Sequence, residues 1–224
     1  MNQIHPDSQV FIIDDDAAIR DSLSLMLEVE GFSVLTFASA NAFLAAAQPK
    51  DISCAIIDIQ MPDMDGLQLQ QAMMERGLSL PIIFLTGHGD IPKSVRAIKA
   101  GALDFLTKPI TQKKLLASLY EALQMAGSRH AQLKRCHEIE GRVNTLTNRE
   151  RQVMSLVLAG HSCKDSARLL GISHRTIEIH RSRLMEKMGV ANVLDLARIT
   201  HDCGLVVDFE DSESVLPKIS LNID

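Results

Sequence analysis

Residues 54–58 read CAIID, an apolar run of strand length that ends in a carboxylate. Similar runs lie on both sides of it, and helical patterns of apolar residues separate them. They are VFIID (10–14), SVLTF (33–37), PIIFLT (81–86) and LDFLT (103–107). Five strand–helix units within residues 1–125 predict an α/β domain, in which helices cover both faces of a parallel sheet.

Acidic residues gather at the ends of two of these predicted strands. Asp14, Asp15 and Asp16 follow the first strand, and the third strand ends at Asp58. Ligands of open α/β sheets bind beyond the carboxyl ends of the strands. If the strand order is 2-1-3-4-5, the two strands are neighbours and their carboxylates repel each other unless a cation joins them. The hard ion Mg²⁺ (or Mn²⁺) is the expected partner. A solvated acidic loop is the alternative for the first three residues taken alone.

The fourth and fifth predicted strands end with a hydroxyl and an ammonium group. Thr86 ends the fourth strand, and Lys108-Pro109 follows the fifth. A Lys-Pro pair alone is a common turn signal. Here, however, four strand ends carry groups that suit the same chemistry. Carboxylates, a metal, a hydroxyl and an ammonium around one point are suited to phosphoryl transfer.

Four segments of this half resemble the receiver domain of two-component response regulators. They are IIDDD (12–16), IIDIQMPDMDG (56–66), FLTGHGD (84–90) and GALDFLTKP (101–109). The resemblance implies a flavodoxin-like, five-stranded parallel sheet in the order 2-1-3-4-5. It also implies that Asp58 is the phosphoacceptor.

The same resemblance implies a metal site. Asp15 and Asp58 would bind Mg²⁺ directly, together with the backbone carbonyl of Gln60. Asp14 would assist through a water molecule.

Further roles follow from the resemblance for residues near the acceptor. Thr86 and Lys108 would contact the phosphoryl oxygens, and the Lys108-Pro109 bond is expected to be cis. Thr86 and Phe105 would act as the switch pair, with phenylalanine where many receivers carry tyrosine. Gln60 and His88 would modulate hydrolysis of the aspartyl phosphate by orienting or obstructing water.

Residues 147–203 read as four short helices without a strand signal. Thr147 and Glu150 form a capping box at the start of the first helix. The ends of the second and third helices are predicted at Ser162, Gly171, Ser173 and about Gly189. Helix, tight turn and helix is the order of a DNA reader. A helical bundle with charges on a solvated face is the alternative.

The third of these helices has one apolar and one polar face. Helical spacing turns Ile177, Leu184 and Met188 inward. The outward residues, which we expect to read base edges, are Arg175, Glu178, Ile179, Ser182 and Arg183. The residues expected to reach phosphates are Lys164, Thr176, His180 and Arg181.

Residues 146–190 resemble the LuxR-type DNA-binding domain almost from end to end. They read LTNRERQVMSLVLAGHSCKDSARLLGISHRTIEIHRSRLMEKMGV. With the receiver, they resemble the FixJ branch of response regulators. The resemblance implies a transcription regulator, not an enzyme with an external substrate. A sensor histidine kinase would phosphorylate Asp58, and the chain would then form a homodimer, bind promoter DNA and, with RNA polymerase, activate transcription.

The chain is expected to have four parts. They are a receiver (1–125), a helical linker (126–146), a helix-turn-helix domain (147–203) and an acidic tail (204–224). The linker helix is interrupted only by Gly127-Ser128, and the tail contains one possible strand.

Charge and composition agree with this division. Residues 1–125 hold 9 Lys/Arg against 15 Asp/Glu, and residues 147–203 hold 9 against 6. The linker adds 4 against 2 and the tail 1 against 5, which gives the net charge of −5. The sign change suggests that the first half meets a cation and the second an anion. No membrane span or signal peptide is indicated, so the chain is expected to be cytoplasmic.

The cysteines show neither C-x-x-C nor metal-ligand spacing. They are Cys54, Cys136, Cys163 and Cys203. Such spacing favours reduced thiols over disulfides or a zinc site.

Two other functions are open at this point. A metal-dependent phosphohydrolase with an aspartyl nucleophile needs similar groups. However, haloacid-dehalogenase-type phosphatases carry D-x-D-x-[TV], whereas residues 14–18 read DDDAA and no cap domain is inserted. The other is a receiver-type regulator that works without phosphorylation.

Overall fold

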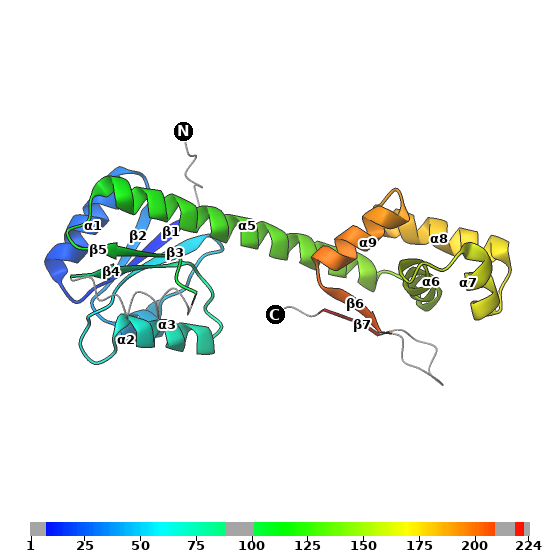
Figure 1. The fold of residues 1–224 in the computed structure, drawn as a ribbon, viewed down its shortest axis with the longest axis horizontal. Helices are drawn as coiled ribbons and strands as arrows, with labels where there is room; N and C mark the ends of the chain where they lie inside the picture. Colours follow the sequence, from blue (N-terminus) through cyan, green and yellow to red (C-terminus); the bar gives the residue numbers. More distant parts are fainter. Residues whose placement is uncertain (1–7, 88–100, 209–217, 222–224) are drawn as a thin grey trace. The chain divides into compact units, whose positions relative to one another are not determined.

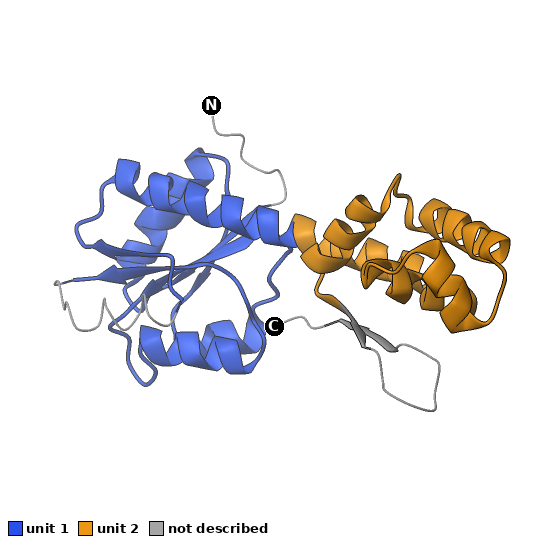
Figure 2. Ribbon diagram, turned by 45° about the vertical axis from the view of Figure 1, so that its right-hand side comes forward, with its two compact units in different colours: residues 1–130 blue, residues 131–224 orange. Residues whose placement is uncertain are grey.

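The computed structural model describes residues 8–87, 101–208 and 218–221. The chain divides into two compact units, residues 1–130 and 131–224 (Figures 1 and 2). The predicted boundaries at residues 125, 146 and 203 stay predictions. Within the described ranges, no helix combines the length and apolar character that crossing a bilayer requires.

The first unit is built on the predicted parallel sheet. Its strands are β1 (Gln9–Ile13), β2 (Ser33–Phe37), β3 (Ser53–Asp58), β4 (Ile82–Thr86) and β5 (Asp104–Thr107). Their order is β2-β1-β3-β4-β5, and every neighbouring pair is parallel. β1, β3 and β4 are buried along their whole length, which explains their continuous apolar sequence. The predicted fold and strand order are confirmed.

Helices cover both faces of this sheet (Figure 1). They are α1 (Ala17–Val29), α2 (Ala40–Ala46), α3 (Gly66–Glu75) and the first part of α5 (Gln112–Asn144). Leu27 of α1 and Leu119 of α5 pack in one core cluster, and Phe43 of α2 and Leu69 of α3 pack in the other. Residues 88–100, where His88 and the start of the predicted fourth helix fall, lie outside the described residues.

Helix α5 is continuous over 33 residues. The expected interruption at Gly127-Ser128 is therefore absent from the structure. A single glycine costs a helix only about 1 kcal/mol relative to alanine. The neighbouring Ala126 is buried in the core of the first unit, and we infer that this packing offsets the cost.

In its described residues, the second unit contains the last part of α5, four further helices and two strands. The elements are α6 (Asn148–Leu158), α7 (Cys163–Leu170), α8 (His174–Met188), α9 (Val193–Asp202), β6 (Leu205–Asp208) and β7 (Lys218–Leu221). The two strands pair in antiparallel fashion, where the sequence indicated one possible strand. A strand needs a partner for its backbone hydrogen bonds, and β7 provides it.

The predicted helix ends of this unit are confirmed. Thr147 and Glu150 form the capping box of α6. The hydroxyls of Ser162 and Ser173 accept hydrogen bonds from the first turns of α7 and α8. Both helices end at a glycine with a left-handed backbone, at φ 64° and φ 67° respectively. Only glycine adopts this conformation without steric cost.

The structure differs from the expectation of reduced thiols at two of the four cysteines. Cys136 of α5 and Cys203 at the end of α9 form a disulfide, although 67 positions separate them in the sequence. Cys54 and Cys163 are free thiols. The fold of the second unit brings the two helices together, which spacing along the chain does not show.

Candidate functional site

The carboxyl ends of β1 and β3 bring three acidic residues together. Asp14 and Asp58 are buried, at 1% and 6% exposure, whereas Asp15 is exposed. One carboxylate oxygen from each residue lies within 4.8 Å of the others. The predicted meeting of these carboxylates is therefore confirmed, and the site is not an ordinary solvated loop.

Lys108 places a positive charge inside this acidic cluster. Its Nζ lies 2.7 Å from Asp14 Oδ2 and 3.1 Å from Asp58 Oδ1. Burial raises the pKa of the Asp58 carboxyl; Lys108 opposes this shift, and Asp14 and Asp15 add to it. Burial lowers the pKa of Lys108, but its bonds to Asp14 and Asp58 outweigh burial, so this pKa is raised overall. The cluster holds three carboxylates against one ammonium, so a further cation would balance it.

The donor set fits a hard divalent cation. All three candidate ligands are carboxylate oxygens, and the exposed Asp15 leaves room for water in the coordination sphere. Mg²⁺ prefers oxygen ligands and keeps several waters. The residues therefore suit a divalent-metal site, and the identity of the metal stays a prediction.

Local backbone contacts hold Asp14 in place. Its Oδ1 accepts a hydrogen bond from the backbone N–H of Asp16 at 2.9 Å. Its backbone carbonyl accepts a hydrogen bond from a guanidinium nitrogen of Arg20 at 2.7 Å. We did not predict a role for Arg20 from the sequence. Its position one turn into α1 is the only local signal that could have indicated one.

Of the other predicted receiver residues, Thr86, Phe105 and Gln60 fall within the described part of the chain and lie at or near the same edge of the sheet. Thr86 is buried at the end of β4, next to the strand that carries Asp58. Phe105 is half-buried in β5, and Gln60 is exposed two residues after Asp58. The Lys108-Pro109 bond is cis, as expected. The roles of these residues and of His88 in phosphoryl chemistry stay predictions.

Gly66, the last residue of the segment IIDIQMPDMDG, packs closely against the end of β3, the strand that carries Asp58. It is the first residue of α3, and a Cβ atom there would lie 2.5 Å from the backbone carbonyl oxygen of Asp58. Real Cβ atoms do not approach a backbone oxygen so closely, so only glycine fits. We did not single out this residue from the sequence, because the contact depends on how α3 packs on β3.

Gly66→Ala is expected to displace the carboxyl end of β3 and to destabilise the first unit by about 1–3 kcal/mol. Denaturant unfolding measures the loss. Gly141→Ala is the matched control, because a Cβ at this helical position meets no atom within 4 Å. This variant is expected to gain up to ~1 kcal/mol of helix stability. If the two variants were equally stable, Gly66 would not be a close-packed position.

Helix α8 presents the predicted polar face to solvent. Ile177, Leu184 and Met188 are completely buried in the core of the second unit. The residues predicted to read base edges are all exposed: Arg175, Glu178, Ile179, Ser182 and Arg183. The predicted inward and outward faces are confirmed, and the base contacts themselves stay predictions.

The residues predicted to reach phosphates differ in their availability. Lys164 is exposed in the first turn of α7. Thr176 is half-buried, and its hydroxyl bonds to Ser173 at 2.8 Å. His180 and Arg181 are also half-buried. The phosphate contacts of these four residues stay predictions, and Lys164 is the one whose side chain is exposed to solvent.

Arg181 is engaged within the protein. A guanidinium nitrogen of this residue donates a hydrogen bond to Cys163 Sγ at 3.3 Å. The contact links α8 to the start of α7. Arg181 therefore has to leave or share this contact if it binds a phosphate.

Two cationic side chains anchor the C-terminal end of α8. Lys187 Nζ lies 2.7 Å from Glu150 Oε2 and 3.0 Å from the carbonyl oxygen of Thr145. Arg142 of α5 donates a hydrogen bond to the carbonyl oxygen of Met188 at 2.8 Å. The sequence showed Glu150 as a capping residue, but not that it also pairs with Lys187. These contacts hold α8 in a defined orientation relative to α6 and to the end of α5.

Glu150→Gln is expected to lower the free energy of unfolding of the second unit by about 1–3 kcal/mol near neutral pH. The reason is that Gln keeps the capping box but loses the charged hydrogen bond to Lys187. Burial raises the pKa of Glu150, yet Lys187 and Thr147 outweigh burial and lower it overall.

The lowered pKa also sets the pH dependence. A carboxyl whose pKa is lowered by folding stabilises the protein above its ordinary pKa, about 4.3, and loses this contribution as pH falls through the folded value. The difference between wild type and Glu150→Gln should therefore shrink below about pH 4.3 in denaturant titrations. Glu186→Gln, on the exposed side of α8, is the control. A difference that stays constant with pH would rule out the ion pair as its source.

The fold and both sites define a receiver domain followed by a helix-turn-helix DNA-binding domain. The response regulator receiver domain family matches residues 10–120. The luxR family of bacterial regulatory proteins matches residues 144–200. These two families cover both halves of the chain.

Relatives share this two-part organisation over most of their length. The response regulator protein TodT of Pseudomonas putida is 42% identical over 193 residues, 86% of this chain and 85% of the relative. The transcriptional regulatory protein FixJ of Bradyrhizobium diazoefficiens is 40% identical over 199 residues, 89% of this chain and 97% of the relative.

A solved structure of the response regulator StyR is also similar, with a TM-score of 0.76 and 36% identity. The similarity covers 87% of this chain and 98% of that one. The chain therefore belongs to the FixJ/TodT family of two-component response regulators. This is a family of transcriptional regulators, so the phosphohydrolase alternative is excluded.

Proposed function

We propose that this response regulator is activated by phosphorylation of Asp58 and then binds promoter DNA as a homodimer. A sensor histidine kinase is the proposed phosphodonor. RNA polymerase is the proposed partner at the promoter, with activation as the outcome. The position of Lys108 between the buried carboxylates of Asp14 and Asp58 carries this proposal.

The proposed chemistry is transfer of a phosphoryl group to a carboxylate. An oxygen of Asp58 forms a bond to phosphorus, the phosphorus–nitrogen bond of the kinase phosphohistidine breaks, and the imidazole regains a proton. The raised pKa of Asp58 reflects a desolvated carboxylate. Lys108 supplies a fixed positive charge for the phosphoryl oxygens. Thr86, at the neighbouring strand end, is proposed to donate a hydrogen bond to one of them.

Mg²⁺ (or Mn²⁺) is proposed to be held by Asp15, Asp58 and the backbone carbonyl of Gln60, with Asp14 assisting through water. When bound, the metal neutralises the negative charge that gathers around the phosphoryl group. The proximity of the three carboxylates supports this assignment.

Phosphorylation is proposed to change, through Thr86 and Phe105, the receiver face that the family resemblance assigns to about residues 91–125, of which the structure describes residues 101–125. Two receivers would then pair about a two-fold axis. Pairing would bring two α8 helices to two DNA half-sites. Lys164 and the exposed residues of α8 support the DNA contact, because these solvent-exposed residues combine cations, an acceptor and an apolar side chain.

Acetyl phosphate and Mg²⁺ are expected to add one phosphoryl group to the wild-type chain. Asp58→Asn is expected to remove this modification completely, because an amide cannot accept the group. Intact-mass spectrometry measures the added phosphate. Asp63→Asn is the matched control, since Asp63 lies in the loop that follows Asp58 and its φ of 65° is one that Asn tolerates. An undiminished phosphoryl group on Asp58→Asn would show that another residue is the acceptor. An unmodified wild-type chain would favour the regulator that works without phosphorylation.

A further inference from the structure

Two cysteines join the last part of α5 to the end of α9 within the second unit. The Cα atoms of Cys136 and Cys203 lie 5.1 Å apart, within the usual range for disulfides. Both side chains are buried in the core cluster that contains Leu184 and Leu196. The packing of the unit thus brings the two sulfur atoms together in its core, and the bond is not a chance contact at the surface.

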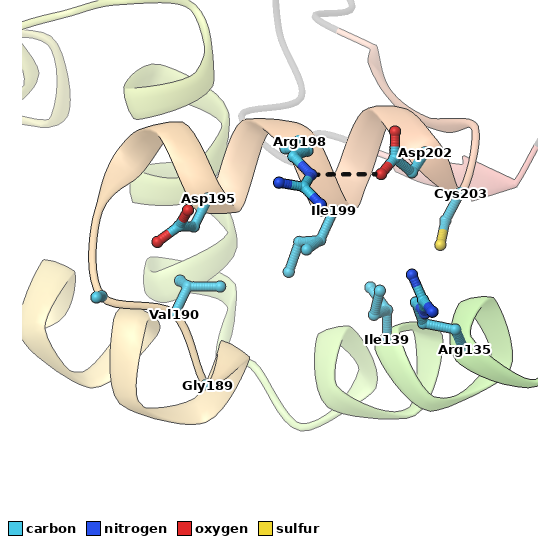
Figure 3. A pocket seen from close by; sticks show the side chains of 10 residues that line it. Arg135, Ile139, Gly189, Val190, Asp195, Arg198, Ile199, Asp202 and Cys203 are labelled. Carbon is cyan, nitrogen blue, oxygen red and sulfur yellow. Dashed lines mark ion pairs between the residues drawn. The ribbon is translucent and has the colours of Figure 1, made fainter. Parts of the chain in front are cut away.

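A cavity of about 450 Å³ gives access to one of these sulfur atoms. It lies between α5 and α9, and Figure 3 shows the sulfur of Cys203 directed toward the helix that carries Arg135 and Ile139. Arg135 and Arg198 bring guanidinium groups to the cavity wall, and Arg198 pairs with Asp202 at 3.9 Å. Asp195 and Asp202 line the same cavity, so charged groups of both signs surround the path by which a small molecule can approach Cys203.

The reduced state also has a hydrogen-bond partner at this position. In the disulfide-bonded structure, Cys136 Sγ lies 4.0 Å from the carbonyl oxygen of Asp202, a distance that would let the reduced thiol donate a hydrogen bond to it. Gln132 Nε2 donates a hydrogen bond to the same carbonyl oxygen at 3.4 Å. The contact between α5 and α9 can therefore persist without the disulfide, so the unit is able to exist in both states.

Transcriptional regulators work where glutathione and thioredoxin keep most thiols reduced, and disulfides that form there are usually transient or redox-sensing. We infer that Cys136 and Cys203 are a reversible redox pair, whose oxidation fastens the end of α9 to α5 and stabilises the DNA-binding unit. The proposed oxidant is a small-molecule disulfide such as oxidised glutathione.

The reaction is a thiol–disulfide exchange in two steps. The thiolate of Cys203 attacks one sulfur of the small disulfide, which forms a mixed disulfide and releases one small-molecule thiolate. The thiolate of Cys136 then attacks Cys203 Sγ, which forms the protein disulfide and releases the second thiolate. The two protons of the cysteines end on the two released thiols, and the small disulfide takes up the two electrons.

Thiol mapping of the full chain tests this inference without any variant. The chain is treated with oxidised or reduced glutathione, denatured and alkylated. Because the sequence holds four cysteines, we expect four alkylated residues after reduction and two after oxidation. A peptide pair joined through Cys136 and Cys203 is expected in the digest of the oxidised sample. Four alkylated cysteines in both samples, or a pair that involves Cys54 or Cys163, would overturn the inference.

Thermal unfolding tests the stabilisation. The disulfide closes a long loop of the unfolded chain, so oxidation is expected to raise the midpoint of the second unit on the order of 10 °C. Cys203→Ser should lose this shift, and Cys163→Ser should retain it. The same shift in Cys203→Ser, or none in wild type, would contradict a stabilising bond. Phosphorylation of Asp58 by acetyl phosphate is measured in the same samples. Because it does not depend on the disulfide, it distinguishes failure of the redox pair from failure of the proposed function.

Discussion

Asp58→Asn is expected to abolish the increase in DNA affinity that phosphorylation produces, while the affinity of the unphosphorylated chain stays the same. A single short helix in one groove binds weakly, whereas two linked readers act on two half-sites at a high effective concentration. Such linkage raises affinity by about 10²- to 10⁴-fold. Since Asp58 lies at the carboxyl end of β3 in the first unit, its substitution leaves the exposed residues of α8 in the second unit unchanged.

DNA-shift titrations measure DNA affinity, and sedimentation measures the mass of the chain in solution; each is done with and without acetyl phosphate. Arg175→Ala is the complementary variant, because it should lower affinity in both states and leave the mass of the phosphorylated chain unchanged. Asp63→Asn should behave as wild type throughout. Equal mass and equal DNA affinity of wild type in both conditions would refute dimerisation and DNA binding driven by phosphorylation, but would leave the fold and the family unaffected.

Removal of residues 131–146 is expected to unfold the DNA-binding unit. This segment of α5 and the turn after it contributes Ile139, Val143 and Leu146 to the core of the second unit. Burial of such side chains is worth ~1.5–3 kcal/mol each, or about 4.5–9 kcal/mol together. A whole domain is stable by only about 5–15 kcal/mol. The loss of Arg142 also removes the hydrogen bond to the end of α8.

Circular dichroism and denaturant unfolding compare the chain 131–224, which keeps the α5 segment, with the chain 147–224, which lacks it. The longer chain is expected to be helical and to unfold cooperatively, and the shorter one to show neither property. Ile139→Ala in the longer chain provides a milder test, with an expected loss of about 2–5 kcal/mol. If the chain 147–224 were as stable as 131–224, the linker helix would not be part of the DNA-binding core.

Most of the fold could be predicted from the sequence because its signals are local. The apolar runs predicted all five strands of the sheet. The signal is continuous in β1, β3 and β4, since strands that are buried on both faces need continuous apolar sequence. The capping residues predicted the ends of α6, α7 and α8, because a cap acts on backbone groups within four residues. The one misplaced break, at Gly127-Ser128, arose because neighbouring packing outweighs the preference of a single residue.

The residue types of the acceptor site were also readable, because parallel strands bring their carboxyl ends to one edge. The sequence thus determined which groups meet: Asp14, Asp15, Asp58 and Lys108. It did not show that Lys108 lies between two buried carboxylates, nor that Gly66 must be small to clear the carbonyl oxygen of Asp58.

Contacts between distant positions were decided by the tertiary structure alone. The ion pair of Lys187 with Glu150 and the disulfide of Cys136 with Cys203 join residues 37 and 67 positions apart. Neither pair follows a periodic pattern, because periodicity reports only which face of a helix is buried. The partner of each side chain is set by how the helices of the second unit pack, and that packing depends on all buried side chains of its core together.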